Sequence, residues 1–261
     1  MIDERAIIHP QAKIAAGVSI GPGSIIGENV EIGENTWIGP QVVIQGPTQI
    51  GKNNKIYQFA SLGNDPQDLT YNGEPTRLEI GDNNIIREYC MISRGTAKGR
   101  AITLIGNNNF LMTYSHIGHD CLVGNHVIMT NYSALSGHVH VEDFAIIGGY
   151  SAIHQFCRIG AYAFIAAATY IGKDVLPYLM ISGLSTSASA AAACGINTVG
   201  LRRRGFASQS IDNLRRAYKI IFRKGFTIQQ AIAELEIMQT ECPEVIPMID
   251  ALNQSTRGIV R

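Results

Sequence analysis

The sequence predicts a mainly β protein, a parallel β-helix of hexapeptide repeats followed by a small α-helical domain. Aliphatic residues recur every six positions from Ile8 to Ile171, and small or β-branched residues usually stand two positions before them. Near the C-terminus, apolar residues recur instead at helical spacing. A period of six fits neither an α-helix nor an ordinary strand. It is typical of a hexapeptide solenoid.

The aliphatic row defines the expected core of this solenoid. Three hexads make one triangular coil, and successive coils stack at about 4.8 Å, so roughly eight coils would form a prism on the order of 40 Å tall. Glycine often follows the aliphatic residue and suits the sharp turn between short strands. The row consists of Ile8, Ile14, Ile20, Ile26, Ile32, Ile38, Ile44, Ile50, Ile56, Leu62, Ile80, Ile86, Ile92, Ile105, Leu111, Ile117, Val123, Met129, Leu135, Val141, Ile147, Ile153, Ile159, Ile165 and Ile171.

The repeat is interrupted near residues 63–77 and 94–101. The first interruption returns in phase at Ile80, and the second returns one residue late, at Ile105. We expect both segments to be loops that leave the prism. Loops on a rigid scaffold often carry binding residues.

The hexads predict a β-helical domain over residues 1–190, and the helical spacing predicts a C-terminal domain over 196–261. The Ser/Ala-rich segment 185–194 between them is interpreted as a linker, with an ordinary helical turn as the alternative.

Three helices are expected in the C-terminal domain. Ser208–Lys224 has apolar residues at helical spacing and ends before Gly225, which is a stop signal. Thr227 and Gln230 form a capping-box pattern that opens a second helix. A third, short helix is predicted over 245–253.

Composition excludes several classes of protein. The formal net charge is zero, so the chain lacks the basic footprint of a nucleic-acid-binding protein. No apolar run is long enough to cross a bilayer, and no signal peptide is recognisable, so we expect a cytoplasmic protein without a stable membrane span. The five cysteines lack disulfide or metal spacing, and Cys121 and Cys157 stand at inward positions. The outward aromatic residues Phe144, Tyr150 and Tyr162 favour self-association.

The candidate chemistry lies in a cluster of histidines between residues 116 and 140. His119, Gly137 and Gln155 are 18 residues apart and would stack on successive coils, with Asp120 in the adjacent column, followed by His138 and Phe156. A histidine, a neighbouring carboxylate and a glycine amide could act as general base, orienting group and oxyanion donor. The alternative is a solvated polar edge.

A basic triplet, Arg202–Arg204, opens the C-terminal domain. Guanidinium groups suit phosphate binding, whereas the alternative is a solvated helix surface.

The chain resembles the family of UDP-N-acetylglucosamine 3-O-acyltransferases of lipid A biosynthesis along almost its whole length. The stretches that carry this resemblance are IHPQAKI, KIYQFASLG, PQDLTYNGEPTRLEIGDNNIIRE, SRGT, HIGHDC, SGHVHVEDFAIIGG, IHQFCRIG, GLRRRGF and STRGIVR. The resemblance implies a left-handed parallel β-helix and a homotrimer with active sites between subunits. It also implies transfer of an (R)-3-hydroxyacyl group from acyl carrier protein to the 3-position of a UDP-sugar. The 4'-phosphopantetheine thioester is then a co-substrate, and neither a metal nor another cofactor is required.

The resemblance also assigns roles by position. His119 matches the general base, Asp120 the residue that polarises it, and the Gly137 amide the oxyanion donor. Ala167 matches the position that closes the acyl groove, so a small residue there predicts a preference for chains of about fourteen carbons over ten. The residues that match substrate-binding positions are Gln67, Asp68, His116, His138, His154, Gln155, Asn197, Arg203 and Arg204.

Three departures from the family pattern are visible. Thr70 stands where the family usually has lysine, Val199 stands where many members have glutamate, and segment 184–193 is longer and richer in alanine. These changes could weaken binding or indicate a 3-amino sugar as the acceptor in place of the 3-hydroxyl.

Three other readings compete with this one. The N-acyltransferase of the same pathway shares the solenoid but carries an extra N-terminal domain, whereas the hexads here begin by Ile8. A γ-type carbonic anhydrase would hold zinc with three histidines, a set that His116, His119 and His138 could imitate. A non-catalytic solenoid is disfavoured, because no outward threonine ladder is present.

Overall fold

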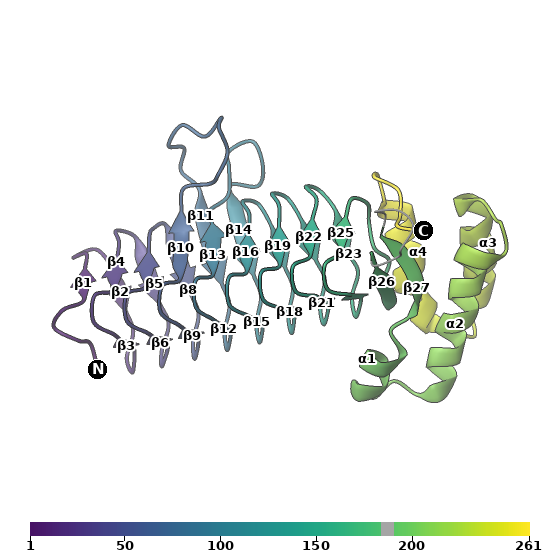
Figure 1. Cartoon of the computed structure of the whole chain (residues 1–261), viewed down its shortest axis with the longest axis horizontal. Helices are drawn as coiled ribbons and strands as arrows, with labels where there is room; N and C mark the ends of the chain where they lie inside the picture. Colours follow the sequence, from purple (N-terminus) through teal and green to yellow (C-terminus); the bar gives the residue numbers. More distant parts are fainter. Residues whose placement is uncertain (184–190) are drawn as a thin grey trace.

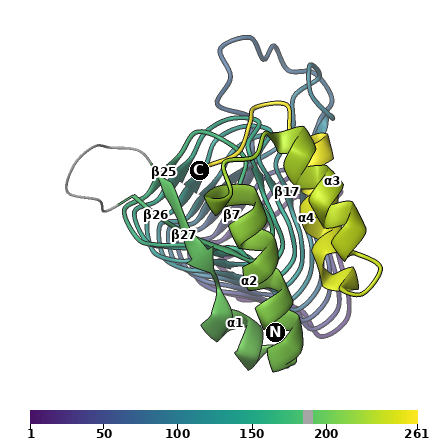
Figure 2. The same cartoon turned by 90° about the vertical axis from the view of Figure 1, so that its right-hand side faces the viewer.

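The computed structural model describes residues 1–183 and 191–261. The chain coils into a long triangular prism, and helices lie at its C-terminal end (Figure 1). Viewed along the axis, the three faces and the stacked coils are visible (Figure 2). Each face is a sheet of short strands that are parallel except for the last pair of the third sheet.

The strands are distributed over the three sheets in regular rotation. The first sheet contains β1 (Ile7–Ile8), β4 (Ile25–Ile26), β7 (Val43–Ile44), β10 (Ser61–Asn64), β13 (Met91–Ser93), β16 (His116–Ile117), β19 (Ala134–Leu135), β22 (Ala152–Ile153) and β25 (Tyr170–Ile171). The second contains β2 (Lys13–Ile14), β5 (Val30–Ile32), β8 (Thr48–Ile50), β11 (Arg77–Ile80), β14 (Ile102–Ile105), β17 (Leu122–Val123), β20 (His140–Val141) and β23 (Arg158–Ile159). The third contains β3 (Ser19–Ile20), β6 (Trp37–Ile38), β9 (Lys55–Ile56), β12 (Ile85–Ile86), β15 (Phe110–Leu111), β18 (Ile128–Met129), β21 (Ile146–Ile147), β24 (Phe164–Ile165), β26 (Leu179–Ser182) and β27 (Ala192–Ile196).

The predicted aliphatic row forms the core of the prism. Partners in neighbouring coils are every third member of the row, as in the pairs Ile26 with Ile44 and Leu135 with Ile153. From Ile20 onward every member of the row is buried, and Cys121 and Cys157 are buried as predicted. Each fully buried aliphatic side chain contributes about 1.5–3 kcal/mol, so this single repeated position supplies much of the driving force for coiling.

Polar residues at inward positions satisfy one another. The side-chain oxygen of Asn54 accepts the amide of Asn84 at 2.8 Å, and that of Asn84 accepts the amide of Asn109 at 2.9 Å. The side-chain nitrogens donate to glycine carbonyls of the next coil. This ladder keeps the buried amides hydrogen-bonded, which burial requires.

The prism has three edges, and both interruptions of the repeat leave from one of them. We call the turns between the first and second sheets the first edge, those between the second and third the second edge, and those between the third and first the third edge. Residues 65–76, the first excursion, connect β10 to β11, and residues 94–101, the second excursion, connect β13 to β14. Because Ile50 pairs with Ile80 and Ile80 pairs with Ile105, the core continues undisturbed beneath both loops. They project together from one side of the prism (Figure 1).

Aromatic side chains stack along the other two edges. On the third edge, neighbouring rings are 4.7–4.9 Å apart in the series Phe59, Tyr89, Tyr114, Tyr132 and Tyr150. On the second edge, His126, Phe144 and Tyr162 stack in the same way. All of these residues have positive φ, because each turn of the coil places one residue in the left-handed region.

The helices follow the prediction closely and add one that it missed. The helices are α1 (Thr198–Arg203), α2 (Ser208–Arg223), α3 (Ile228–Met238), the 3₁₀ helix η1 (Pro243–Val245) and α4 (Ile246–Gln254). The predicted capping box of α3 is present: Thr227 and Gln230 each accept the other's backbone N–H. The six-residue helix α1 was not predicted, because it is too short to show an apolar period.

The interpretation of 185–194 as a linker is wrong for the last residues of this segment, from Ala192 onward. Ala192–Ile196 forms β27, which pairs antiparallel with β26 and extends the third sheet. The strand is held there by tertiary contacts, including the Tyr218 hydroxyl, which donates to the Ala193 carbonyl at 2.8 Å. Residues 184–190, which include most of the alanine-rich departure, lie outside the described residues.

The C-terminal segment returns to the end of the solenoid. Ser255 donates its hydroxyl to Asp174 at 2.7 Å, and Val260 donates its amide to the Asp174 carbonyl at 2.9 Å. Among the helices of the described residues, none is long and apolar enough to cross a membrane.

Candidate active site

The predicted columns of chemical residues meet on the first edge. His119 and Asp120 lie in the turn between β16 and β17, and Gly137 and His138 lie in the turn of the next coil. The His138 amide donates to the His119 carbonyl at 2.9 Å, which fixes the two turns in register. Gln155 occupies the corresponding position one coil further on. The stacking predicted from the 18-residue interval is therefore observed.

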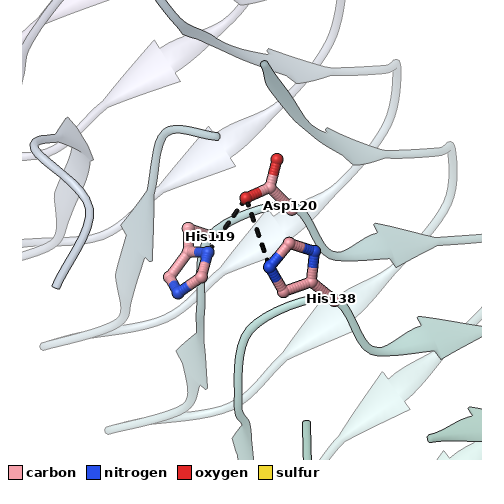
Figure 3. A group of neighbouring side chains, drawn as sticks. All are labelled: His119, Asp120 and His138. Atoms are coloured by element: carbon pink, nitrogen blue, oxygen red, sulfur yellow. Dashed lines mark hydrogen bonds and ion pairs between the residues drawn. The ribbon is translucent and has the colours of Figure 1, made fainter. Parts of the chain in front are cut away.

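His119 and Asp120 form a hydrogen-bonded pair. Nδ1 of His119 lies 2.9 Å from Oδ2 of Asp120 (Figure 3). Because an ionised carboxylate only accepts hydrogen bonds, Nδ1 is the donor, and Nε2 of the neutral ring carries the lone pair. His138 approaches the same oxygen through Nε2 at 3.8 Å, too long for a hydrogen bond (Figure 3).

The Asp120 carboxylate is enclosed by the second excursion. Its relative exposure is 2 %. The Thr96 hydroxyl donates to Oδ2 at 2.7 Å, the Thr96 amide donates to both oxygens at 3.0–3.1 Å, and the Arg100 amide donates to Oδ1 at 2.8 Å. Burial alone would raise the pKa of Asp120, but the hydrogen bonds from Thr96, His119 and Arg100 outweigh it and hold this pKa below its usual range.

Two glycines make room for this arrangement. A Cβ on Gly137 would lie 2.6 Å from Nε2 of His119, so the imidazole rests directly against the Gly137 backbone. A Cβ on Gly99, in the second excursion, would lie 2.6 Å from Oδ2 of Asp120. In the described parts of the chain the Gly137 amide donates to no backbone or side-chain acceptor, which leaves it free for a ligand. Nε2 of His119 and the free Gly137 amide are thus close together.

Two further histidines beside this pair are held in the neutral form. Burial lowers the pKa of His116, and burial likewise lowers the pKa of His138. Nδ1 of His116 is buried and has no hydrogen-bond partner among the described residues. Both histidines are half-buried.

The first excursion brings two more predicted residues to this edge. The Gln67 amide nitrogen lies 3.4 Å from Sδ of Met91, on the strand beside His116. Asp68 accepts hydrogen bonds from the Thr70 amide at 2.8 Å and the Thr70 hydroxyl at 2.9 Å. These two bonds are the main cause of the lowered pKa of Asp68. Thr70, a departure from the family pattern, is therefore a partner of a candidate site residue.

His154 and Gln155 lie on the same edge, nearer the helices, and both are exposed. Nδ1 of His154 lies 3.1 Å from a guanidinium nitrogen of Arg257 and 3.1 Å from the Gln155 carbonyl. The C-terminal segment thus reaches the upper end of the first edge.

Four other predicted residues are not brought to the first edge within one chain. Asn197 caps α1 by accepting the Gly200 amide at 3.1 Å, and its side-chain nitrogen donates to the Tyr162 carbonyl at 2.9 Å. The Arg204 guanidinium lies over the Phe144 ring on the second edge at 4.7 Å. Arg203 lines a cavity of about 440 Å³ on the outer face of the third sheet.

Exposed Val199 lines the same cavity as Arg203, together with Phe164 and Met180. Ala167 is exposed on the third edge, in register with Asn131 and Gly149. Ser185, which the 18-residue interval would place next in this column, lies outside the described residues. One protomer therefore distributes the predicted residues over three edges.

A metal-binding arrangement is also conceivable at the first edge. Among the described residues, the ligand atoms of His119, Asp120 and His138 lie within 4.8 Å of one another. His116, which the zinc hypothesis required, is not in this group. Oδ2 of Asp120 already accepts hydrogen bonds from Thr96 and His119, so this oxygen has little capacity left for an ion. The donor set fits an orienting carboxylate better than a metal ligand.

Sequence reasoning missed the residues that hold Asp120. Thr96, Gly99 and Arg100 lie in the second excursion, where the repeat gives no register. The available signal was the one-residue slip, which marks a segment that leaves the first edge beside the His119 turn.

Comparisons with known proteins define the class first. The profile of six bacterial-transferase hexapeptide repeats matches residues 1–33 and 29–64, and the profile described as "Udp N-acetylglucosamine O-acyltransferase; Domain 2" matches residues 174–260. The chain is thus a transferase of the hexapeptide-repeat class.

Full-length relatives define the family. Acyl-[acyl-carrier-protein]–UDP-N-acetylglucosamine O-acyltransferases of Stutzerimonas stutzeri and Pseudomonas paraeruginosa are 51% and 53% identical, over 100% of this chain and 99% of theirs. The structure of the Acinetobacter baumannii protein named LpxA matches with a TM-score of 0.95 and 50% identity, over 100% of this chain and 99% of that one. This chain belongs to the family of acyl-[acyl-carrier-protein]–UDP-N-acetylglucosamine O-acyltransferases. Its fold is the left-handed parallel β-helix with a small helical C-terminal part that the sequence predicted.

Proposed function

We propose that this chain transfers an (R)-3-hydroxyacyl group from acyl carrier protein to the 3-position of UDP-N-acetylglucosamine, the first step of lipid A biosynthesis, with His119 as the general base. Family membership supports the reaction. The base assignment is carried by one observation, the 2.9 Å contact between His119 Nδ1 and Asp120 Oδ2. That contact leaves Nε2 unprotonated in the neutral ring and therefore able to accept a proton.

The reaction follows as direct acyl transfer. Nε2 of His119 removes the proton of the sugar 3-hydroxyl while that oxygen attacks the thioester carbonyl. The Gly137 amide donates a hydrogen bond to the oxyanion that develops. When the C–S bond breaks, the proton on Nε2 passes to the pantetheine sulfur. The products are the 3-O-acylated UDP-sugar and the free thiol of the carrier protein, with no acyl-enzyme.

Asp120 supports this cycle electrostatically. The buried carboxylate stabilises the imidazolium that forms, so Nε2 of His119 accepts a proton more readily. Neutral His116 and His138 would meet the sugar and phosphates as hydrogen-bonding groups, and Gln67 and Asp68 would meet the sugar from the first excursion.

We propose further that the working unit is a homotrimer. Asn197, Arg203 and Arg204 lie away from the first edge of their own protomer, so a neighbouring protomer has to supply them if they bind the nucleotide beside His119. His154 and Gln155 lie on the first edge itself and would be supplied in cis. The exposed aromatic stack on the third edge supports self-association. Sedimentation of the purified protein would test this, and a monomer with full activity would contradict it.

The donor is expected to approach the helical end. The donor, acyl carrier protein, is taken to be acidic. The C-terminal helical part carries exposed basic residues, which are Arg202, Arg203, Arg204, Arg215, Arg216, Arg223 and Lys224. Such a surface would speed encounter and make the rate depend on salt. A salt-independent kcat/KM would count against this role. The cytoplasmic location expected from the sequence stays a prediction.

Ala167 supports a long acyl groove. With only a methyl group at that exposed position, we expect donors of about fourteen carbons to be preferred over ten. Higher activity with the ten-carbon donor would contradict this expectation.

The deciding experiment is mass-spectrometric detection of acyl transfer. Metal-free protein is mixed with UDP-N-acetylglucosamine or its 3-amino analogue, and with 3-hydroxyacyl carrier proteins of about ten to sixteen carbons. His119→Gln runs in parallel, because glutamine keeps the polarity but not the basicity. Product from the wild type alone supports both the reaction and the base. No product with any pair would overturn the proposal, and stoichiometric zinc in the purified protein would then favour a metal hydrolase or hydratase.

A further inference from the structure

We infer that Thr96, at the start of the second excursion, is a positioning residue that orients Asp120 and, through it, the general base His119. This inference rests on the proposed function. It concerns a residue that no repeat, motif role or family assignment above singles out.

The contact between Thr96 and Asp120 is direct and buried. Thr96 is 3 % exposed and Asp120 is 2 % exposed. Thr96 donates both its hydroxyl, at 2.7 Å, and its amide, at 3.0 Å, to Oδ2, the same oxygen that accepts from His119 Nδ1. The bond from the hydroxyl is short, as expected for a donor to an ionised carboxylate.

The geometry of Asp120 leaves it dependent on these donors. Asp120 itself has a φ of +59°, an uncommon conformation for aspartate, and its own amide donates to the Thr103 hydroxyl at 2.9 Å. Asp120 is thus held at two points, its backbone amide by Thr103 on β14 and its carboxylate by the second excursion. Because the Thr96 hydroxyl and His119 Nδ1 both contact Oδ2, the bond from Thr96 helps to keep that oxygen turned toward His119.

Charge around the pair has several sources. His119 lies on the same turn, His138 on the next coil, Arg100 in the second excursion, and Asp68 in the first. The Arg100 and Thr96 amides supply the remaining donors to the carboxylate. The Thr96 side chain donates to Asp120 and has no proposed role toward the substrate. Its hydroxyl can therefore be removed without changing the proposed binding groups.

Removing the hydroxyl should change catalysis in a particular way. In Thr96→Val the carboxylate loses one donor, becomes a stronger base and is less firmly aimed. We expect kcat to fall about ten- to hundredfold with KM for the UDP-sugar changed less than threefold. The acid limb of the pH profile of kcat/KM should move to higher pH by roughly half a unit, because the His119–Asp120 pair binds its proton more tightly.

Two variants serve as controls. Thr96→Ser keeps the hydroxyl and should retain kcat within about threefold. Thr36→Val removes another fully buried threonine hydroxyl, which donates to the Gly51 carbonyl at 2.9 Å in coils far from the first-edge turns of His119. It should lower the thermal midpoint without moving the pH profile.

A second readout does not depend on activity. Histidine labelled at Cε1 with ¹³C is titrated by NMR, with the His119 signal assigned from His119→Gln. The titration midpoint of His119 should move to higher pH in Thr96→Val and stay unchanged in Thr96→Ser and Thr36→Val.

The outcomes separate the two proposals. If the wild type transfers no acyl group with any substrate pair, the proposed function fails and the NMR midpoint alone decides the role of Thr96. An unmoved midpoint in Thr96→Val overturns the inference, as does a kcat within threefold of wild type in an active enzyme. A fall in kcat matched by Thr36→Val at equal loss of stability would also overturn it, because the effect would then be structural only.

Discussion

The two excursions leave the same edge of the prism on neighbouring coils, yet they are built in opposite ways. The second excursion folds down onto Asp120 and buries Arg94, Gly95 and Thr96. The first projects outward, and its Leu69 side chain is fully exposed. Asp120 is held by another segment of chain, whereas the Asp68 carboxylate, within the part of the chain that the structure describes, accepts hydrogen bonds only from its near neighbour Thr70. A loop packed onto Asp120 thus serves the proposed base, and a more exposed loop serves the proposed sugar contacts.

This difference fits the demands of the two tasks. A general base must be held in one geometry, because catalytic groups lose effect when misplaced by about 1 Å. A loop that meets a substrate has to let that substrate enter and leave, and such loops belong to the less stable parts of a protein. This chain thus combines both loops on one β-helical scaffold.

The largest test of the comparison replaces one glycine in each excursion. In Gly99→Ala the new methyl group would lie 2.6 Å from Oδ2 of Asp120, so the carboxylate has to move. We expect kcat to fall on the order of a hundredfold. Gly73→Ala meets nothing within 4 Å, although its φ of +84° costs about 1–2 kcal/mol of local strain.

Activity of Gly73→Ala should therefore stay within about threefold of wild type. Steady-state acyl transfer measured for both variants decides the matter. Equal losses would show that the two loops are equally coupled to the chemistry and would remove the basis of the comparison.

A second test uses acid. The pKa values of Asp120 and Asp68 are both lowered in the folded protein, but only Asp120 is buried. A lowered carboxyl pKa stabilises the fold fully above the unfolded value of about 3.9, and this contribution is lost as the pH falls through the folded value. Asp120→Asn should lower the thermal midpoint by several degrees at pH 7, and this gap to wild type should close below about pH 4.

The matched variant Asp68→Asn should show a much smaller gap that closes in the same direction, because its carboxylate is more exposed to solvent. Thermal melts of the three proteins between about pH 3 and about pH 8 provide the measurement. A gap for Asp120→Asn that persists unchanged at pH 3 would mean that the charge of Asp120 is not what stabilises this edge.

A third test loosens the first excursion from its base. Arg94 begins the second excursion but donates to the Gly63 carbonyl at 2.9 Å, the Gly46 carbonyl at 3.0 Å and the Tyr71 hydroxyl at 2.9 Å, and it also pairs with Asp65. Arg94→Met removes these bonds. We expect KM for the UDP-sugar to rise about tenfold, more than kcat falls, because the loop that carries Gln67 and Asp68 is released.

Hydrogen exchange should accelerate at residues 65–76 in Arg94→Met and remain slow in the core strands. Arg77→Met is the control, since Arg77 is exposed and, among the described residues, its side chain pairs only with the nearby Glu79 at 2.6 Å. If KM is unchanged while the loop exchanges faster, the first excursion does not contribute to sugar binding.

Much of this architecture could be predicted, and the reason is the repeat. Once Ile117 is known to point inward, the interval of 18 residues places Gly137 beside His119 without any tertiary information. Burial of the cysteines and the capping box of α3 followed from equally local rules.

What could not be predicted lies where the repeat stops. The Thr96 side chain contacts a residue 24 positions away, and the Arg94 side chain contacts residues 23 or more positions away. Both contacts involve loops whose conformation no period describes. Strand β27 was missed for a related reason: Ala192–Ile196 is alanine-rich and has low strand propensity, and only its pairing with β26 makes it a strand. Tertiary contacts override local preference at both places.

The smallest expected effect concerns Thr70, at the position where the sequence resemblance implies a lysine. Its hydroxyl donates to Asp68 at 2.9 Å, while the Thr70 amide donates to the same oxygen at 2.8 Å. Thr70→Val removes only the first bond, so Asp68 keeps its position and loses part of its stabilisation. We expect KM for the UDP-sugar to rise two- to fivefold (about one weak hydrogen bond) with kcat unchanged.

Thr70→Ser should behave as wild type, because serine can donate the same bond. Thr70→Lys introduces the residue that the sequence resemblance implies at this position, and it replaces a donor to Asp68 by a cation beside it. Isothermal titration of UDP-N-acetylglucosamine into the four proteins separates these cases. Tighter binding by Thr70→Lys with unchanged binding by Thr70→Val would show that the missing positive charge at residue 70, and not the hydrogen bond of its hydroxyl, sets the affinity. The first excursion would then not depend on its internal hydrogen bond.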